Sequence, residues 1–263
     1  MSFYRTFVIH MKRITISSRF KNHTIGLKKI ISNFSNEGYI LGDQPRNEIR
    51  VINFNDVTLN IKSFKKPGFL NKVIYGYIRK SKAERSYNYA SILKENGIGT
   101  PEPIAYFENK SITGLNDSYY ISEHINADLT FRELVTDPNF PNNEKILREF
   151  VHFTHSLHEN NILFKDHSPG NTLVVKTKDV YAFYLVDLNR MNFKQLSFSE
   201  RMKNFSRLTP KKEMIATMSD EYAKITLRDY DTIFNEMWKY TAEFQEKYAR
   251  KKRLKKKFLF WKK

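Results

Sequence analysis

The sequence predicts an α+β fold with two lobes, and three observations support it. Strand-like runs dominate before residue 125, whereas helical patterns dominate after residue 142. Segregated strands and helices are typical of α+β proteins rather than of an alternating α/β sheet. A length of 263 residues, 40% of them hydrophobic, suffices for one two-lobed domain or two small domains. We therefore expect a small lobe over 1–125, a large lobe over 126–249 and a basic aromatic tail over 250–263.

Composition narrows the classes of partner and site. A net charge of +17 favours anionic partners such as nucleic acid, an acidic membrane face or a phosphorylated substrate. The chain has no cysteine, which excludes disulfides and thiolate metal sites. No run of apolar residues is long enough for a transmembrane helix. The apolar stretch from Phe3 to Met11 is too short and too interrupted for a signal peptide.

The small lobe is predicted to begin with antiparallel strands. Three strand-like runs follow one another, and Asn55-Asp56 marks a hairpin between the second and the third. They cover Gly38 to Gly42, Glu48 to Phe54 and Val57 to Phe64. The turn from Gly42 to Asn47 separates the first two runs. Its backbone amides are placed to contact a phosphate, but one glycine is also what an ordinary hairpin turn needs.

Lys62 is the candidate phosphate-binding lysine of this lobe. Alternation along the third strand places Leu59 and Ile61 on one face and Lys62 on the other. A lysine on the inner strand face, opposite the glycine turn, would pair with the α- and β-phosphates of a nucleotide. The alternative is a solvated lysine, since Lys65 and Lys66 follow closely.

A helix and two more strands complete the predicted small lobe. Apolar residues at helical spacing predict a helix over 80–96, which Asn96-Gly97 would end. Strands are expected over 104–108 and 118–124. These strands fit the fourth and fifth strands of a kinase small lobe, in which Glu123 and Ile125 would belong to the hinge that contacts adenine through backbone groups.

The stretch from Leu163 to Val175 carries the predicted chemistry. Asp166 and Asn171 lie five residues apart around a Ser-Pro-Gly turn, and Asp187 follows another apolar run. This pattern is typical of a protein-kinase-like phosphotransferase, in which the first acid orients the acceptor hydroxyl and the other two residues hold Mg²⁺. The spacing alone is common by chance, so the alternative is an Asn/Gly turn in an unrelated α+β domain. A strong amphipathic helix over 144–159 precedes the stretch and favours the first interpretation.

Helices are also expected over 198–205, 211–222 and 229–248, before a basic C-terminus. The seventeen residues from Lys247 to Lys263 include ten Lys or Arg, with aromatic and leucine side chains between them. Aromatic residues among lysines suit an interfacial contact with an anionic membrane. The alternative is a solvated tail that only adds solubility.

The motifs together resemble the lipopolysaccharide core sugar kinases, the Kdo/heptose kinase group of the protein-kinase-like superfamily (Kdo is 3-deoxy-D-manno-octulosonic acid). The resemblance covers roughly residues 38–190 and is most specific over 97–104 and 163–175. It implies a two-lobed protein-kinase-like fold. It also implies ATP-dependent phosphorylation of a sugar hydroxyl on a lipid A–core acceptor, at the cytoplasmic face of the inner membrane.

The resemblance also assigns roles and shows two departures. Asp166 and Lys62 match the catalytic pair, while Asn171 and Asp187 match the ligands of Mg²⁺. The usual His-Arg-Asp becomes Phe164-Lys165-Asp166, so an aromatic residue replaces the histidine that braces the loop. The helix acid that pairs with Lys62 is either Glu84 or is replaced by Asn88, one turn later.

Other functions remain open at this point. A Ser/Thr protein kinase usually carries an Ala-Pro-Glu-like anchor, which is missing between Asp187 and Tyr230. A kinase for a cationic antibiotic fits a basic protein poorly. A non-catalytic membrane-bound scaffold is disfavoured by the complete set of site residues, and we expect no nucleic acid because the sequence contains no recognised binding motif for it. Lys165 and Arg190 would face either an anionic acceptor, the γ-phosphate or a structural ion-pair partner.

Overall fold

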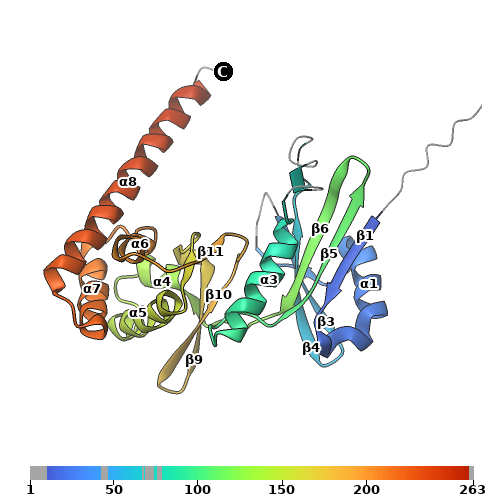
Figure 1. Ribbon diagram of the computed structural model, residues 1–263, viewed down its shortest axis with the longest axis horizontal. Helices are drawn as coiled ribbons and strands as arrows, with labels where there is room; N and C mark the ends of the chain where they lie inside the picture. Colours follow the sequence, from blue (N-terminus) through green and yellow to red (C-terminus); the bar gives the residue numbers. More distant parts are fainter. Residues whose placement is uncertain (1–10, 43–46, 67, 69–73, 76–78, 261–263) are drawn as a thin grey trace, which may run out of the picture. The chain divides into compact units, whose positions relative to one another are not determined.

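A computed structural model describes residues 11–42, 47–66, 68, 74–75 and 79–260 of the chain. The chain divides into two compact units, Met1–Asn126 and Ala127–Lys263. Unit 1 contains an antiparallel sheet with helices, and unit 2 is mainly helical (Figure 1). The predicted α+β class with a β-rich small lobe and a helical large lobe is confirmed.

Unit 1 is organised around a six-stranded antiparallel sheet with the order β1-β5-β6-β4-β3-β2. The first strand, β1, forms one edge of the sheet and pairs with β5. The strands are β1 Met11–Ile16, β2 Tyr39–Ile40, β3 Asn47–Phe54, β4 Val57–Phe64, β5 Pro103–Ser111 and β6 Gly114–Glu123. The helices are the 3₁₀ helix η1 Ser18–His23, α1 Thr24–Ser32, the 3₁₀ helix η2 Phe34–Asn36 and α3 Lys82–Glu95.

The two faces of this sheet bury different helices (Figure 1). On one face, Leu59 and Ile61 of β4 pack in the main core with Leu27 of α1. On the other face, Phe64 packs with Ala83 of α3 and with Tyr106 of β5. Because side chains alternate along a strand, Lys62 shares the face of Phe64 and lies on the α3 side of the sheet.

Unit 2 combines two small sheets with a helical core. The antiparallel sheets have the orders β10-β9-β7 and β11-β8. Their strands are β7 Leu129–Thr130, β8 Ile162–Phe164, β9 Thr172–Thr177, β10 Val180–Leu185 and β11 Met191–Phe193. The helices are α4 Phe131–Thr136, α5 Asn143–Glu159, the 3₁₀ helix η4 Pro169–Asn171, α6 Phe198–Asn204, α7 Lys212–Thr226 and α8 Tyr230–Phe260.

One hydrophobic core holds the helices of unit 2 together. Phe150 of α5 is fully buried and packs against Phe131 of α4, with ring centroids 4.4 Å apart. Ile215 of α7 and Ile233 of α8 are buried in the same cluster. The amphipathic pattern predicted for 144–159 therefore forms the central helix of this unit, which supports the strand and loop that follow it.

Helix α8 differs from the sequence prediction at its C-terminal end. The predicted helix ends at Tyr248, whereas α8 continues without interruption to Phe260. Every residue from Glu246 to Lys256 is exposed, so this part of the helix has no packing partner in unit 2. The basic segment predicted as a tail is therefore helical over its described part, and Trp261 to Lys263 lie outside the described residues. Within the part that the structure describes, no helix is both long and apolar enough to cross a membrane.

Candidate active site

The predicted catalytic loop connects β8 to β9 in unit 2. Asp166 follows β8 by two residues, and Asn171 closes the 3₁₀ turn η4 before β9. The Asn171 side chain donates from Nδ2 to the Asp166 carbonyl oxygen over 2.8 Å. The Asn171 carbonyl accepts from the Val186 amide over 3.0 Å. Asn171 therefore ties the loop that carries Asp166 to the chain that leads into Asp187.

Asp187 lies immediately after the β9–β10 hairpin, in a left-handed backbone conformation with φ of 59°. Asn189 donates to its Oδ1 over 2.8 Å, which fixes one carboxylate oxygen. The Asn171 amide nitrogen is engaged by Asp166, so its oxygen is the atom left to bind a cation. Mg²⁺ prefers oxygen ligands and takes only one or two protein side chains beside substrate phosphates. The donor atoms of Asn171 and Asp187 fit that preference.

A cluster of three or more acidic, histidine or cysteine residues suited to a metal is not found among the described residues. The described residues therefore do not form a metal site built from such protein ligands alone. A nucleotide-bound Mg²⁺ does not need one, because the phosphates and water complete its coordination.

Asp166 is held by two arginines. Arg190 Nη1 donates to Asp166 Oδ1 over 3.0 Å, and Arg207 Nη1 donates to the same oxygen over 2.9 Å. The Asp166 side chain is 15% exposed, while those of Arg190 and Arg207 are 57% and 36% exposed. Among the described residues, Asp166 Oδ2 accepts no hydrogen bond. The arginines orient the carboxylate through one oxygen and leave the other without a donor among the described residues.

Local structure fixes the positions of both arginines. The β8–β11 pairing places Met191 opposite Phe164, and the Lys165 amide donates to the Arg190 carbonyl over 3.1 Å. Arg190 is thereby anchored beside the catalytic loop. Arg207 follows α6, donates to the Lys165 carbonyl over 2.9 Å and places its guanidinium 5.7 Å from the ring centroid of Phe244 in α8. Of the alternatives predicted for Arg190, the ion pair is present in the structure, and its partner is Asp166.

Buried polar side chains support the catalytic loop through a hydrogen bond to its backbone. Asn204 Nδ2 donates to the Phe164 carbonyl over 2.8 Å, so Asn204 Oδ1 is the acceptor for His158 Nε2 at 3.2 Å. The hydroxyl of Tyr222 lies 3.1 Å from His158 Nδ1 and donates to it. The loop that lacks the usual histidine at Phe164 is thus supported through its backbone, by an asparagine from α6 and a histidine from α5.

His167, next to Asp166, is buried between aromatic rings. Its ring centroid lies 5.3 Å from that of Phe150 and 5.9 Å from that of Phe164. Burial lowers the pKa of His167 to about 4, and the nearby amide of Asn204 opposes this shift only in part. Burial likewise lowers the pKa of His158 to about 3. Both imidazoles are therefore neutral at neutral pH and serve packing rather than charge.

Unit 1 carries the predicted nucleotide-binding residues. Lys62 is partly buried, with Nζ 5.5 Å from the ring centroid of Phe64, whereas Lys65 and Lys66 are exposed. Gly42 adopts φ of 70°, a left-handed conformation that suits glycine. The rest of the predicted phosphate-covering turn, 43–46, lies outside the described residues.

Glu84 is the acid on the face of α3 that packs against the sheet. Its side chain is 5% exposed and pairs with Arg13 Nη1 at 3.2 Å and with Lys80 Nζ at 3.8 Å. Asn88 is partly buried and makes no hydrogen bond to another described side chain. Glu84 is thus the charged anchor of α3, and its pairing with Lys62 remains a prediction.

The predicted hinge follows β6. The Glu123 amide donates to the Glu102 carbonyl over 2.9 Å, and the His124 amide donates to the Thr58 carbonyl over 2.7 Å. Among the described residues, the Ile125 amide has no hydrogen-bond acceptor. A contact of the Ile125 amide with an adenine ring remains a prediction.

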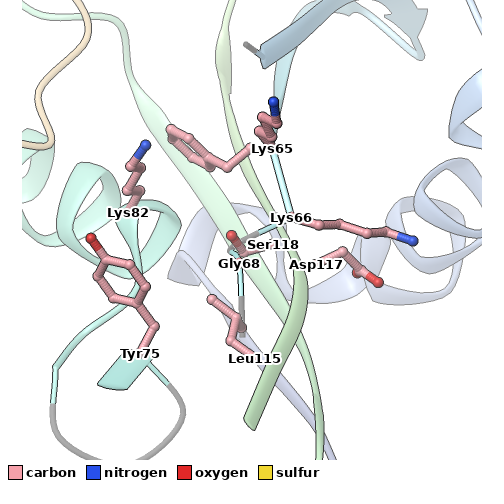
Figure 2. Close-up of a pocket in the computed structure, with 9 residues that line it drawn as sticks. Lys65, Lys66, Gly68, Tyr75, Lys82, Leu115, Asp117 and Ser118 are labelled. Atoms are coloured by element: carbon pink, nitrogen blue, oxygen red, sulfur yellow. The ribbon is translucent and has the colours of Figure 1, made fainter. Parts of the chain in front are cut away.

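A separate pocket of about 260 Å³ lies at the C-terminal end of β4, where Phe64 forms part of its lining (Figure 2). Lys65, Lys66 and Lys82 line it together with Tyr75 and Asp117. The three ammonium groups point in different directions rather than toward one point. This pocket therefore does not form a converging anion site.

Sequence analysis missed three residues that hold the candidate site: Arg13, Asn204 and Arg207. They lie 71, 40 and 41 positions from Glu84, Phe164 and Asp166, the residues that they contact. Local spacing patterns carry no signal over such separations.

Comparisons with known proteins agree with the family resemblance predicted from the sequence. Residues 46–234 match the model of the lipopolysaccharide kinase (Kdo/WaaP) family. A solved structure described as WaaP in complex with acyl carrier protein is similar, with a TM-score of 0.63 and 14% identity. The similarity covers 90% of this chain and 98% of that one. No individually curated protein matches the sequence. Since the family model spans well over half of the chain, the protein belongs to the lipopolysaccharide kinase (Kdo/WaaP) family.

Proposed function

We propose that this kinase transfers the γ-phosphate of ATP to a hydroxyl of Kdo or heptose in the lipopolysaccharide inner core, at the cytoplasmic face of the inner membrane. Membership of the family carries the general activity, phosphorylation of a lipopolysaccharide sugar with ATP. The observation that supports the assignment of the site is the bonding of Asn171, which joins the Asp166 loop to the segment before Asp187.

Asp166 receives the proton in the proposed reaction. The acceptor hydroxyl oxygen forms a bond to the γ-phosphorus, the bond from that phosphorus to the β–γ bridging oxygen breaks, and ADP leaves. The hydroxyl proton passes to Asp166 Oδ2, the carboxylate oxygen that the two arginines do not occupy. General-base assistance of this kind contributes roughly 10²–10⁴-fold to the rate.

Asn171 and Asp187 hold Mg²⁺ in this proposal, and the bound ion neutralises charge on the phosphates. Lys62 contacts the α- and β-phosphates from the α3 side of β4. The backbone at Gly42 covers the phosphates, and the Ile125 amide with the Glu123 carbonyl binds adenine. Glu84 keeps α3 in place beside Lys62.

The direct test is transfer of radiolabel from ATP to defined acceptors. Kdo–lipid A and heptosylated lipid A are offered in parallel, with a generic protein substrate and an aminoglycoside as controls. We expect label in one of the two lipid-linked sugars, lost in Asp166→Asn. Label in the protein or antibiotic, or equal labelling by wild type and variant, would overturn the proposal.

We also propose that the exposed end of α8 binds the anionic surface of the membrane. Arg250, Lys251, Lys252, Arg253, Lys255 and Lys256 are all exposed on this helix, and Leu254 is exposed among them. A basic residue close to an acidic leaflet contributes about 1 kcal/mol, so a few such contacts give useful affinity. This location would bring the active site to a lipid-linked acceptor.

Truncation after residue 249 tests the membrane contact. Co-sedimentation with vesicles of rising anionic lipid content is measured at low and high salt. We expect binding that salt weakens and truncation removes, since exposed charges are screened over about 10 Å at 0.1 M salt. Vesicle binding that survives truncation would contradict the proposal. Binding to acyl carrier protein, the partner of WaaP in the similar structure, is measured in parallel. If truncation removed this binding and left vesicle binding unchanged, α8 would be a contact for that protein rather than for the membrane.

A further inference from the structure

The surroundings of Asp166 contain more positive charge than its orientation requires. Two guanidinium groups converge on one carboxylate oxygen of Asp166. A single arginine suffices to orient a carboxylate. One carboxylate oxygen therefore faces two guanidinium groups.

The contacts of both arginines to Asp166 are monodentate. Each uses only Nη1 on Oδ1, although a guanidinium group has five N–H donors in a planar fork. Among the described side chains, Arg190 contacts no acid other than Asp166, and neither does Arg207. The preferred partner of such a fork is a carboxylate or phosphate bound through two oxygens. Donors of both arginines are therefore left for a second anion.

The two arginines are both accessible to solvent and anchored. Both side chains remain substantially open to solvent, at 57% and 36%. Their positions are nevertheless fixed, Arg190 by the β8–β11 pairing and Arg207 by the Lys165 carbonyl and the Phe244 ring. Fixed and solvent-accessible cations lose little side-chain entropy when they bind an anion.

We propose that Arg190 and Arg207 form the anion-binding site of the acceptor and make the enzyme specific for an acidic sugar substrate. The site takes a carboxylate or a phosphate group that lies close to the reacting hydroxyl. This inference rests on the proposed function, because it assumes that Asp166 accepts the hydroxyl proton. The anion would then be recognised by the two arginines, and the hydroxyl by the carboxylate that they contact.

The test uses the full-length protein and three forms of one acceptor. The first is Kdo–lipid A, the second carries the Kdo carboxylate as a neutral amide, and the third lacks the lipid A phosphates. Initial rates with Arg190→Gln, Arg207→Gln and Arg190→Lys give kcat and KM for each form. Arg228→Gln is the matched control, since Arg228 is an exposed arginine of unit 2 that lies over the Phe198 ring.

For wild type and the control, we expect removal of the recognised anion to raise the acceptor KM about tenfold or more. For Arg190→Gln and Arg207→Gln, the KM for the intact acceptor rises to a similar extent, and removing the anion then has little further effect. Arg190→Lys restores only part of the discrimination, because lysine lacks the planar fork. The KM for ATP stays within about twofold. The amide arm identifies a carboxylate as the ligand, and the dephosphorylated arm identifies a phosphate.

A lower kcat with unchanged discrimination between charged and neutral acceptors would overturn the inference, because the arginines would then only position Asp166. Failure of the proposed function looks different. In that case the wild-type enzyme phosphorylates neither Kdo–lipid A nor heptosylated lipid A.

Discussion

Glu84 in unit 1 and Asp166 in unit 2 are both acids held by arginines from outside their own motifs, but the two settings differ. Glu84 is 5% exposed on a helix, and Arg13 reaches it from the edge strand β1. Asp166 lies on a loop and shares one oxygen between two arginines that remain partly open to solvent. Burial and a helical position make the first pair an anchor for α3. In the second, each arginine uses only one nitrogen on Asp166 and keeps other donors, which makes the pair the proposed binding site for the anion of the acceptor.

The largest expected effect is on the rate of phosphoryl transfer, when Asp166 of the catalytic loop is replaced. Asp166→Ala should lower phosphoryl transfer by about 10³-fold while ATP binding survives, because the residue handles the acceptor proton. Asp187→Ala should instead abolish Mg²⁺-dependent nucleotide binding. Calorimetric titration with ATP, with and without Mg²⁺, separates the two. An equal loss of ATP affinity in both variants would contradict this division of roles.

The contribution of His167, next to Asp166, to the free energy of unfolding should depend on pH. Burial lowers the pKa of His167 to about 4 from an ordinary value of 6.5, so the unfolded chain binds more protons between these values. Stability is therefore full above pH 6.5 and falls by about 3 kcal/mol toward pH 4 from this residue alone.

Urea unfolding of wild type and His167→Phe at several pH values measures this contribution. The phenyl ring keeps the packing between Phe150 and Phe164 and cannot be protonated. We expect the difference in unfolding free energy between the two proteins to change across this range. A difference that is constant between pH 7 and pH 4 would show that His167 is not buried as described.

A smaller effect is expected at the anchor in unit 1. Glu84→Gln should lower kcat by about tenfold, equivalent to about 1.4 kcal/mol, if Glu84 keeps Lys62 and α3 in place. Asn88→Ala is the matched control on the next turn of α3 and should change kcat by less than about twofold. The reverse order of effects would make Asn88 the partner of Lys62.

The comparison also shows what sequence can predict. Asp166 and Asn171 lie five residues apart in one loop, so the spacing alone reveals their pattern, and the alternation of β4 likewise places Lys62. Arg13 and Arg207 reach their acids only through the β1–β5 pairing and the packing of α6, which no local pattern encodes. The sequence prediction ends α8 too early, although Tyr230 to Phe260 contains no glycine or proline and many lysines favour a helix.

The most direct measurement compares Arg13→Gln with Arg207→Gln in the same two assays, urea unfolding and the KM for the lipid-linked acceptor. The account predicts that Arg13→Gln lowers the unfolding free energy by about 1 kcal/mol and leaves the acceptor KM unchanged, since it weakens a half-exposed ion pair. Arg207→Gln should instead raise the acceptor KM about tenfold. The same change in both assays for the two variants would contradict the distinction between an anchoring and a substrate-binding arginine.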